Sequence, residues 1–179
     1  MSDLSQLREQ VARSCRMLGK LNLTKEPSGH VSARIPGEDK VLIKARGPEE
    51  SGLRFVTARD IITVDFAGKK VAGDDGLETP QEVFIHTWLY KTRPDVQCVV
   101  HFHPITVVLF TICSKPLLPL FGAYDPSALR LLVEGLSTYP RSVTVSSEKL
   151  GEEFARAMGQ KQGCLMRGHG ITTAGASIE

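Results

Sequence analysis

Apolar residues at the start of the chain recur every three or four positions, and polar residues, many of them arginine or glutamate, fill the positions between them. The apolar set consists of Leu4, Leu7, Val11, Cys15 and Leu18. This spacing places the apolar side chains along one face of an α-helix. The pattern therefore predicts an amphipathic helix that opens the chain and ends near Gly19.

An alternation of apolar and polar residues follows, which is typical of strands with one buried face. Residues 45–52 interrupt it and are rich in glycine, proline and charge, so they are expected to form a loop. The strands are expected over residues 31–35, 41–43, 55–56 and 61–64 and around Val71.

A helix is expected over residues 79–92, because its start carries the signals of a capping box. Thr79 would be the N-cap, Pro80 the first helical residue and Glu82 the carboxylate that completes the box. After this helix, residues 96–103 form an apolar, β-branched run between turn signals. Such a run indicates a largely buried central strand.

The second half of the chain mixes helices with strands. The expected helices cover residues 104–113, 126–135 and 147–158, and the expected strands cover residues 143–145, 164–166 and 171–173. No repeating strand–helix–strand rhythm connects these elements. The order of elements therefore predicts an α/β protein with a mainly antiparallel sheet flanked by helices.

Composition restricts the class of protein. The chain has 179 residues, of which 41% are hydrophobic and 23% charged, and this suits one globular domain over residues 1–179. Its net charge is +2 and its basic residues are scattered, so nucleic acid is not expected as a partner. No secretory leader and no long apolar run is seen, which disfavours a membrane partner. The four cysteines show no Cys-x-x-Cys spacing, and buried, reduced thiols in a cytoplasmic protein are expected.

Candidate chemistry concentrates around residues 99–104. His101 and His103 are two apart on an extended strand, so their side chains share a face. His169 between two glycines and the carboxylate of Glu82 complete an inventory of three imidazoles and one acid. That inventory is typical of a zinc site with a coordination position open for substrate.

Each of these residues also has a simpler interpretation. Strand histidines often form local hydrogen bonds, and His169 could be a turn residue. A capping box alone would explain Glu82, which could instead be a proton shuttle with a tuned pKa. His86, one helical turn after Glu82, is expected to be structural, and His30 is either a loop residue or part of a pocket.

Several motifs in a specific order resemble the class II aldolase/adducin family. They are Gly29-His30-Val31-Ser32, Thr79-Pro80-Gln81-Glu82 with His86 and Tyr90, Arg93-Pro94-Asp95-Val96, Val100-His101-Phe102-His103-Pro104 and Arg167-Gly168-His169-Gly170. The resemblance covers nearly the whole chain. It implies a single-domain α/β/α sandwich with a central, mainly antiparallel sheet, and a homo-oligomer, usually a homotetramer, with sites at subunit interfaces.

The resemblance also implies roles for individual residues. His101, His103 and His169 match the histidines that hold a divalent metal, usually zinc, with manganese, iron or cobalt as alternatives. Glu82 matches the acid that acts on the substrate proton. The metal would stabilise the enolate or enediolate left when a carbon–carbon bond breaks. Tyr124 is a candidate for a second acid donated across an interface, although a packing role is also open.

Departures from the sugar-phosphate members of the family bear on the substrate. Those members tend to have Gly-Asn where this chain has Gly29-His30, and two hydroxyl residues before the acid where it has proline and glutamine. The residues expected to bind substrate are Gly29, His30, Arg46 and Gly47. A guanidinium suits a carboxylate through a two-pronged contact. In these features the chain resembles the branch of the family that decarboxylates hydroxylated aromatic acids, which implies a carbon–carbon lyase with decarboxylation slightly ahead of aldol cleavage.

Two alternatives remain at this point. One is an aldolase or epimerase that acts on a sugar or sugar phosphate, and the other is a non-enzymatic, adducin-like binding or scaffold domain. The chain ends at Glu179, where Ser177 resembles the N-cap of a further helix, so a C-terminal helical segment is expected to be missing.

Overall fold

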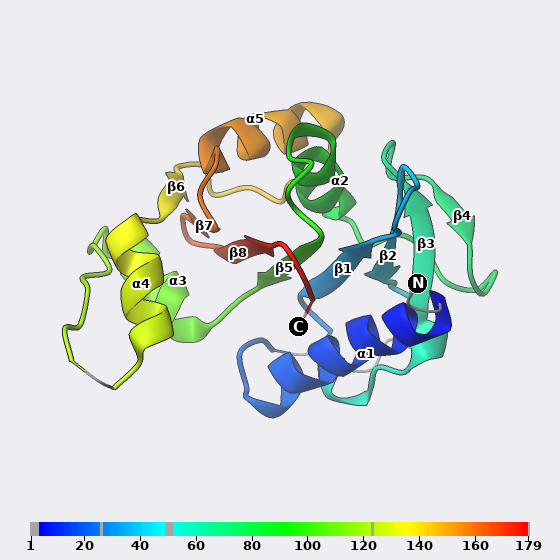
Figure 1. Cartoon of the computed structure of the whole chain (residues 1–179), viewed down its shortest axis with the longest axis horizontal. Helices are drawn as coiled ribbons and strands as arrows, with labels where there is room; N and C mark the ends of the chain where they lie inside the picture. The colour runs from blue at the N-terminus through cyan, green and yellow to red at the C-terminus, as the bar shows by residue number, and fades with distance from the viewer. Residues whose placement is uncertain (1–3, 26, 49–51, 123, 179) are drawn as a thin grey trace.

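An eight-stranded sheet runs through the middle of the computed structural model, which describes residues 4–25, 27–48, 52–122 and 124–178 (Figure 1). The strands are β1 (His30–Arg34), β2 (Lys40–Lys44), β3 (Ile61–Asp65), β4 (Lys70–Ala72), β5 (Cys98–Phe102), β6 (Ser137–Tyr139), β7 (Gly163–Met166) and β8 (Gly170–Gly175). Their order in the sheet is β4-β3-β2-β1-β5-β8-β7-β6. All neighbouring strands are antiparallel except β6 and β7, which are parallel.

Helices cover both faces of this sheet. They are α1 (Leu4–Lys20), α2 (Val83–Thr92), α3 (Ile105–Ile112), α4 (Pro126–Glu134) and α5 (Glu148–Met158), with short 3-10 helices η1 (Leu53–Phe55) and η2 (Ala58–Asp60). In the view of Figure 1, α1 lies below the sheet and α2 and α5 lie above it, whereas α3 and α4 extend from one end. The expected α/β/α layering is therefore present.

Strand alternation divides the core into two clusters. In β2, Val41 and Ile43 pack in the cluster that contains α2 and α5, whereas Leu42 packs in the cluster that contains α1. In β1, Val31 and Ala33 belong to the α1 side. The polar residues between them consequently face α2, which is the side of the sheet where the functional side chains gather.

Three expectations about local structure are wrong. Residues 55–56 are not a strand, because η1 ends at Phe55, whose side chain is exposed while Leu53 is buried. Residues 143–145 are not a strand either. The side chain of Val145 is buried, but its backbone does not join the sheet, and the strand of this region is β6. The helix expected from Thr79 begins only at Val83.

The late start of α2 has a physical cause. The backbones of Arg46 and Glu78 form two hydrogen bonds, of 2.9 and 2.8 Å, which hold the chain extended just before the expected cap. Glu82 is the N-cap residue of α2, but its side chain makes no capping hydrogen bond. The side chain of Glu82 is therefore free to take part in another contact.

The cysteines are free thiols, and three of them, Cys15, Cys98 and Cys164, are buried as expected, whereas Cys113 is exposed. Burial raises the pKa of Cys15 and of Cys98 to about 12, so both stay protonated at neutral pH. None of the helices within the described residues combines the length and apolar character needed to cross a membrane.

Candidate metal centre and substrate pocket

Four side chains from distant parts of the chain meet at one end of β5. His101 lies on β5 and His103 directly follows this strand, His169 lies in the turn between β7 and β8, and Glu82 lies at the start of α2. One ligand atom from each of the four lies within 4.8 Å of the others. The residues that sequence analysis selected as three imidazoles and one acid are thus brought together.

The ring nitrogens Nε2 and one carboxylate oxygen form the centre of this group. His101 Nε2 lies 2.8 Å from His103 Nε2. The carboxylate oxygen Oε2 of Glu82 lies 3.3 Å from His101 Nε2 and 3.2 Å from His169 Nε2. Nitrogen and oxygen donors at these separations are the set that zinc and similar divalent ions bind.

The contacts behind the group orient two of its members. His101 Nδ1 lies 3.0 Å from the Thr172 hydroxyl, whose own hydrogen points to the sulfur of Met166. The Nδ1–H of His101 therefore donates to Thr172, which leaves Nε2 of His101 without a hydrogen. Glu82 Oε1 accepts a hydrogen bond of 2.9 Å from the amide of Val145, and this holds Oε2 toward the histidines.

This arrangement fits a bound cation. With its hydrogen on Nδ1, His101 presents a lone pair at Nε2 only 3.3 Å from the Glu82 carboxylate, and both atoms are acceptors. Two buried acceptors that face each other need a proton or a cation between them. A hydrogen bond from behind a ligating histidine is also the usual way in which a metal site fixes the ring.

Protonation states agree with this interpretation. Burial lowers the pKa of His101, and burial together with the nearby His101 and His169 rings lowers the pKa of His103 to about 4. Burial alone would raise the pKa of Glu82, but His101 and His169, when a proton lies between them and the carboxylate, hold it below its usual range through hydrogen bonds and positive charge, and a metal cation would take the place of that proton. Neutral imidazoles and an ionised carboxylate are the forms that bind a metal ion.

Two glycines allow the chain to approach this group closely. A Cβ atom at Gly170 would lie 2.4 Å from the Phe102 carbonyl oxygen and 2.7 Å from a ring carbon of His103. Gly29 has a φ of +94° and also lies against the backbone of His101. A larger residue at Gly170 would displace His103, and Gly29 supplies a conformation that other residues rarely adopt.

A pocket of about 290 Å³ opens beside the four side chains. It is small but close to the size of a site for a single-ring molecule. Its lining combines Glu82, His103 and His169 with Gly29, His30 and Arg46, and it also includes Pro27, Ser28, Pro80, Gln81 and Thr144. Three of the four expected substrate-binding residues therefore line the same pocket as the candidate metal group.

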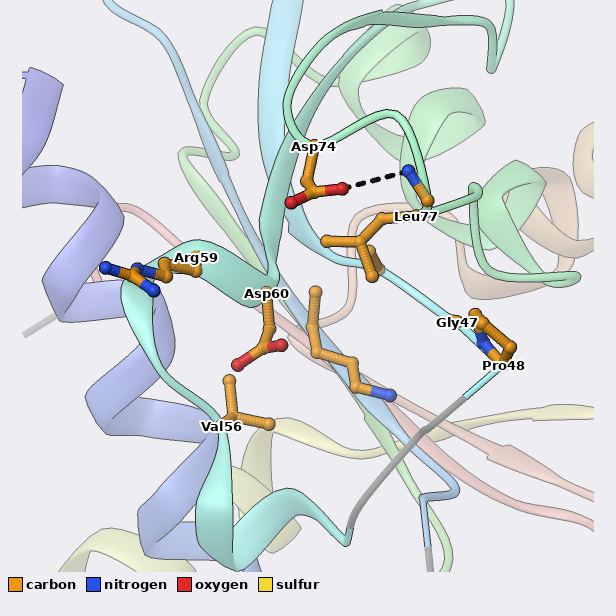
Figure 2. A pocket seen from close by; sticks show the side chains of 10 residues that line it. Gly47, Pro48, Val56, Arg59, Asp60, Asp74 and Leu77 are labelled. Atoms are coloured by element: carbon orange, nitrogen blue, oxygen red, sulfur yellow. Dashed lines mark hydrogen bonds between the residues drawn. The ribbon is translucent and has the colours of Figure 1, made fainter.

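Two expected site residues lie elsewhere. Gly47 lines a neighbouring cavity of about 320 Å³, and Figure 2 shows it beside Pro48, with Val56, Asp60 and Leu77 also around this cavity. Tyr124 lies on the segment before α4 and is 90% exposed. Within this single chain Tyr124 therefore makes no part of the pocket.

Arg46 reaches the pocket with part of its charge already paired. One terminal nitrogen of its guanidinium lies 2.6 Å from a carboxylate oxygen of Glu78, and both side chains are exposed. An exposed pair of this kind contributes little stability and is easily exchanged. The remaining donors of the Arg46 fork are available to an acid in the pocket.

Some contacts in the site were not expected from the sequence. The capping box proposed for Glu82 is wrong, because Glu82 bonds to the Val145 amide and lies beside His101 and His169 instead. Thr172 was also missed, although it is the register partner of His101 between β5 and β8. Prediction of the pairing between β5 and β8 in this register would have placed Thr172 next to His101. No feature of the local sequence indicates that the Val145 amide bonds to Glu82.

Comparison with known proteins agrees with these observations. Residues 9–179 match the family model described as the class II aldolase and adducin N-terminal domain. A 3,4-dihydroxyphthalate decarboxylase from Arthrobacter keyseri is 41% identical over 96% of this chain and 70% of its own length. An enzyme of the same description from a Terrabacter species is 38% identical over 96% of this chain and 72% of its own length.

A solved structure described as an L-fuculose 1-phosphate aldolase from Glaciozyma antarctica superposes with a TM-score of 0.80 at 22% identity. The match covers 97% of this chain and 65% of that structure, so this chain spans less than two thirds of its length. At this identity the likeness concerns the fold alone. The expected α/β/α sandwich with a mainly antiparallel sheet is thereby confirmed.

Proposed function

This chain belongs to the class II aldolase and adducin family, and from that premise we propose that it is a divalent-metal-dependent lyase that decarboxylates a dihydroxylated aromatic acid. Its similarity to decarboxylases and to class II aldolases indicates an enzyme of the lyase type. The observation that carries the proposal is the meeting of Glu82 Oε2 with three imidazoles beside a pocket lined by Arg46. The substrate named for the two bacterial decarboxylases, 3,4-dihydroxyphthalate, combines the hydroxyl and carboxylate groups that such a pocket can bind.

The metal would be held by His101, His103 and His169, with the Glu82 carboxylate at its side. Zinc is the expected ion, and manganese, iron and cobalt are the alternatives that three imidazoles accept. When bound, such an ion polarises a substrate oxygen and stabilises the negative charge that develops during the reaction.

The residues of the chain account for the proton and for substrate orientation. Loss of carbon dioxide breaks one carbon–carbon bond and leaves its electron pair on a ring carbon, which must then receive one proton. Glu82 lines the pocket as an ionised carboxylate, so it would take a proton from a ring hydroxyl of the substrate and deliver that proton to the ring carbon. Arg46, at another part of the lining, would hold a carboxylate of the substrate and so orient the ring.

The proposal is tested by incubating the metal-loaded protein with 3,4-dihydroxyphthalate and, separately, with L-fuculose 1-phosphate. We expect release of carbon dioxide and formation of a dihydroxybenzoate, measured by gas analysis and chromatography, from the aromatic acid alone. Aldehyde release from the sugar phosphate without decarboxylation would contradict the proposal in favour of an aldolase. No reaction with either compound, from protein that binds metal, would contradict it in favour of another substrate.

Arg46→Ala is expected to raise KM for 3,4-dihydroxyphthalate about tenfold or more, because a charge-assisted contact to a carboxylate is lost. Metal content should not change, since Arg46 is not among the four clustered residues. A matched control is Lys40→Ala, which removes a partly exposed cation that pairs with Glu38 and does not line the pocket. Equal KM values for wild type and Arg46→Ala would remove Arg46 from substrate binding.

The surface next to the pocket supports self-association of the chain. After His103, the segment through α3, the following loop and α4 exposes a series of large apolar side chains: Ile105, Leu109, Phe110, Ile112, Leu118, Leu120, Phe121 and Val133. Apolar surfaces of this extent commonly form protein interfaces. A homo-oligomer, a tetramer by resemblance, would cover them, and the exposed Tyr124 of one copy could then donate a proton in the pocket of another.

Phe121→Asp is expected to lower the molar mass measured by light scattering to that of a smaller assembly or a monomer, because it places a charge in the proposed interface. Phe55→Asp is the matched control, since Phe55 is also an exposed phenylalanine but lies in η1, which packs with α1. A wild-type chain that is already monomeric, or an assembly that Phe121→Asp leaves intact, would contradict this placement of the interface.

A further inference from the structure

A line of four buried polar side chains connects the pocket with the interior on the α2 side of the sheet. His30 and Ser32 alternate on β1, and His86 and Tyr90 are one turn apart on α2. The Tyr90 hydroxyl lies 2.8 Å from Ser32 Oγ, Ser32 Oγ lies 2.7 Å from His86 Nδ1, and His86 Nε2 lies 3.1 Å from His30 Nδ1. We call this line the buried hydrogen-bond chain.

The hydrogens of this chain have one favoured direction. If Tyr90 donates to Ser32 and Ser32 donates to His86 Nδ1, every hydroxyl hydrogen has a short, normal acceptor. In the opposite direction Ser32 donates to Tyr90, and the hydrogen of the buried Tyr90 hydroxyl then has no other hydrogen-bond acceptor within the described residues. If Tyr90 still donates to Ser32, the Ser32 hydrogen could go only to the Val99 carbonyl, at 3.5 Å, which is long for a hydroxyl donor. The favoured direction leaves His86 with its single hydrogen on Nε2, from which it donates to His30 Nδ1.

His30 therefore carries its own hydrogen on Nε2. Burial lowers the pKa of His86 to about 3 and lowers that of His30 well below its usual value, so both rings are neutral and hold one hydrogen each. Nε2 of His30 has no hydrogen-bond partner within the part of the chain that the structure describes. Among the described residues, the hydroxyl oxygen of Thr87 is the one fully buried side-chain polar atom that lacks a hydrogen-bond partner. Nε2 of His30 lacks a partner as well, so it must be partly accessible. Because His30 lines the pocket, its Nε2–H is available to a molecule bound there.

We propose that the buried hydrogen-bond chain fixes the tautomer of His30, so that His30 offers an Nε2–H donor to an anionic oxygen of the substrate and never an acceptor. Ser32 and His86 are then positioning residues that act through His30. The inference rests on the proposed function for the identity of the substrate, which would present a carboxylate or a phenolate oxygen. It gives the pocket a neutral donor in addition to the cation of Arg46, and it disfavours ligands that need an acceptor at this position.

The direction of the hydrogens is measurable without any substrate. Two-bond nitrogen–proton NMR spectra of the full chain with ¹⁵N-labelled histidine distinguish the two tautomers, and the His30 signals are assigned by their loss in His30→Asn. We expect the Nε2–H tautomer at His30 in the wild type, and a mixture of tautomers in Ser32→Ala. Tyr90→Phe is the matched control, because Ser32 can still donate to His86 and the tautomer should stay as in the wild type. An Nδ1–H tautomer at His30 in the wild type would overturn the inference, whatever the enzyme decarboxylates.

Kinetics separate a positioning role from a merely structural one. Ser32→Ala is expected to raise KM for 3,4-dihydroxyphthalate about fivefold to tenfold and to change kcat less, because a fraction of the molecules would present an acceptor. In a His30→Asn background, whose amide is a donor without tautomers, adding Ser32→Ala should have no further effect on KM. Equal effects in both backgrounds would show that Ser32 only supports packing, and would overturn the inference. If the wild type decarboxylates nothing, the proposed function fails while the NMR result still decides the tautomer.

Discussion

His103→Ala is expected to reduce bound divalent metal from about one ion per chain to a small fraction of that. The substitution removes one of the three imidazoles whose ligand atoms lie within 4.8 Å of one another and of the Glu82 carboxylate. No other histidine can take its place, because His30 and His86 bond to each other. The remaining His101, His169 and Glu82 form an incomplete set for a tight site. Elemental analysis of protein purified without a histidine tag or added metal measures the effect.

A matched control uses the same kind of residue in a different place. His86→Gln removes a buried imidazole that is outside the cluster of four and does not line the pocket, so its metal content should equal that of the wild type. Circular dichroism of both variants shows whether they fold. Metal retained in His103→Ala would contradict the proposed centre, as would equal loss in two folded variants. A wild type that binds no metal after reconstitution would favour the scaffold interpretation.

Most of the fold follows from the hydrophobic pattern. The amphipathic spacing predicted α1, and alternation or apolar runs predicted β1, β2, β3, β5, β7 and β8, because each of these elements has a face that must be buried. The pattern gave wrong predictions where burial of a side chain and pairing of its backbone in the sheet do not occur together. Val145 is fully buried but bonds through its amide to a side chain, so it looks like a strand residue without being one. Conversely, β6 is a short strand with little apolar signal, and its pairing with β7 is fixed by tertiary structure.

The candidate site was predictable to a similar degree. Alternation along a strand placed His101 and His103 on one face, and motif order added His169 and Glu82; the structure places all four within 4.8 Å. Local sequence could not show what holds them. The bonds from Val145 to Glu82 and from His101 to Thr172 join residues 63 and 71 positions apart. Such contacts depend on strand order and helix placement, which a local pattern does not specify.

Glu82→Gln is expected to lower kcat for decarboxylation about a hundredfold to ten-thousandfold, the range usual for loss of a general acid, while the protein keeps its metal. In the wild type the Val145 amide donates a hydrogen bond of 2.9 Å to Glu82 Oε1. The carbonyl oxygen of glutamine can accept the same bond, so the side chain should stay in place. Its amide cannot release and recover a proton at neutral pH, and this is the property that the reaction requires. Steady-state kinetics and elemental analysis on the same sample measure both effects.

Glu78→Gln supplies the control for Glu82→Gln, because it makes the same chemical change at an exposed carboxylate that pairs with Arg46 at the rim of the pocket. It should leave kcat nearly unchanged and, by freeing the guanidinium, lower KM slightly. The two measurements on Glu82→Gln then divide the roles of Glu82. Loss of metal equal to that of His103→Ala would make Glu82 a ligand that the centre cannot do without. An unchanged kcat with metal retained would mean that another group delivers the proton. Tyr124 of a neighbouring copy is the next residue to test for that role.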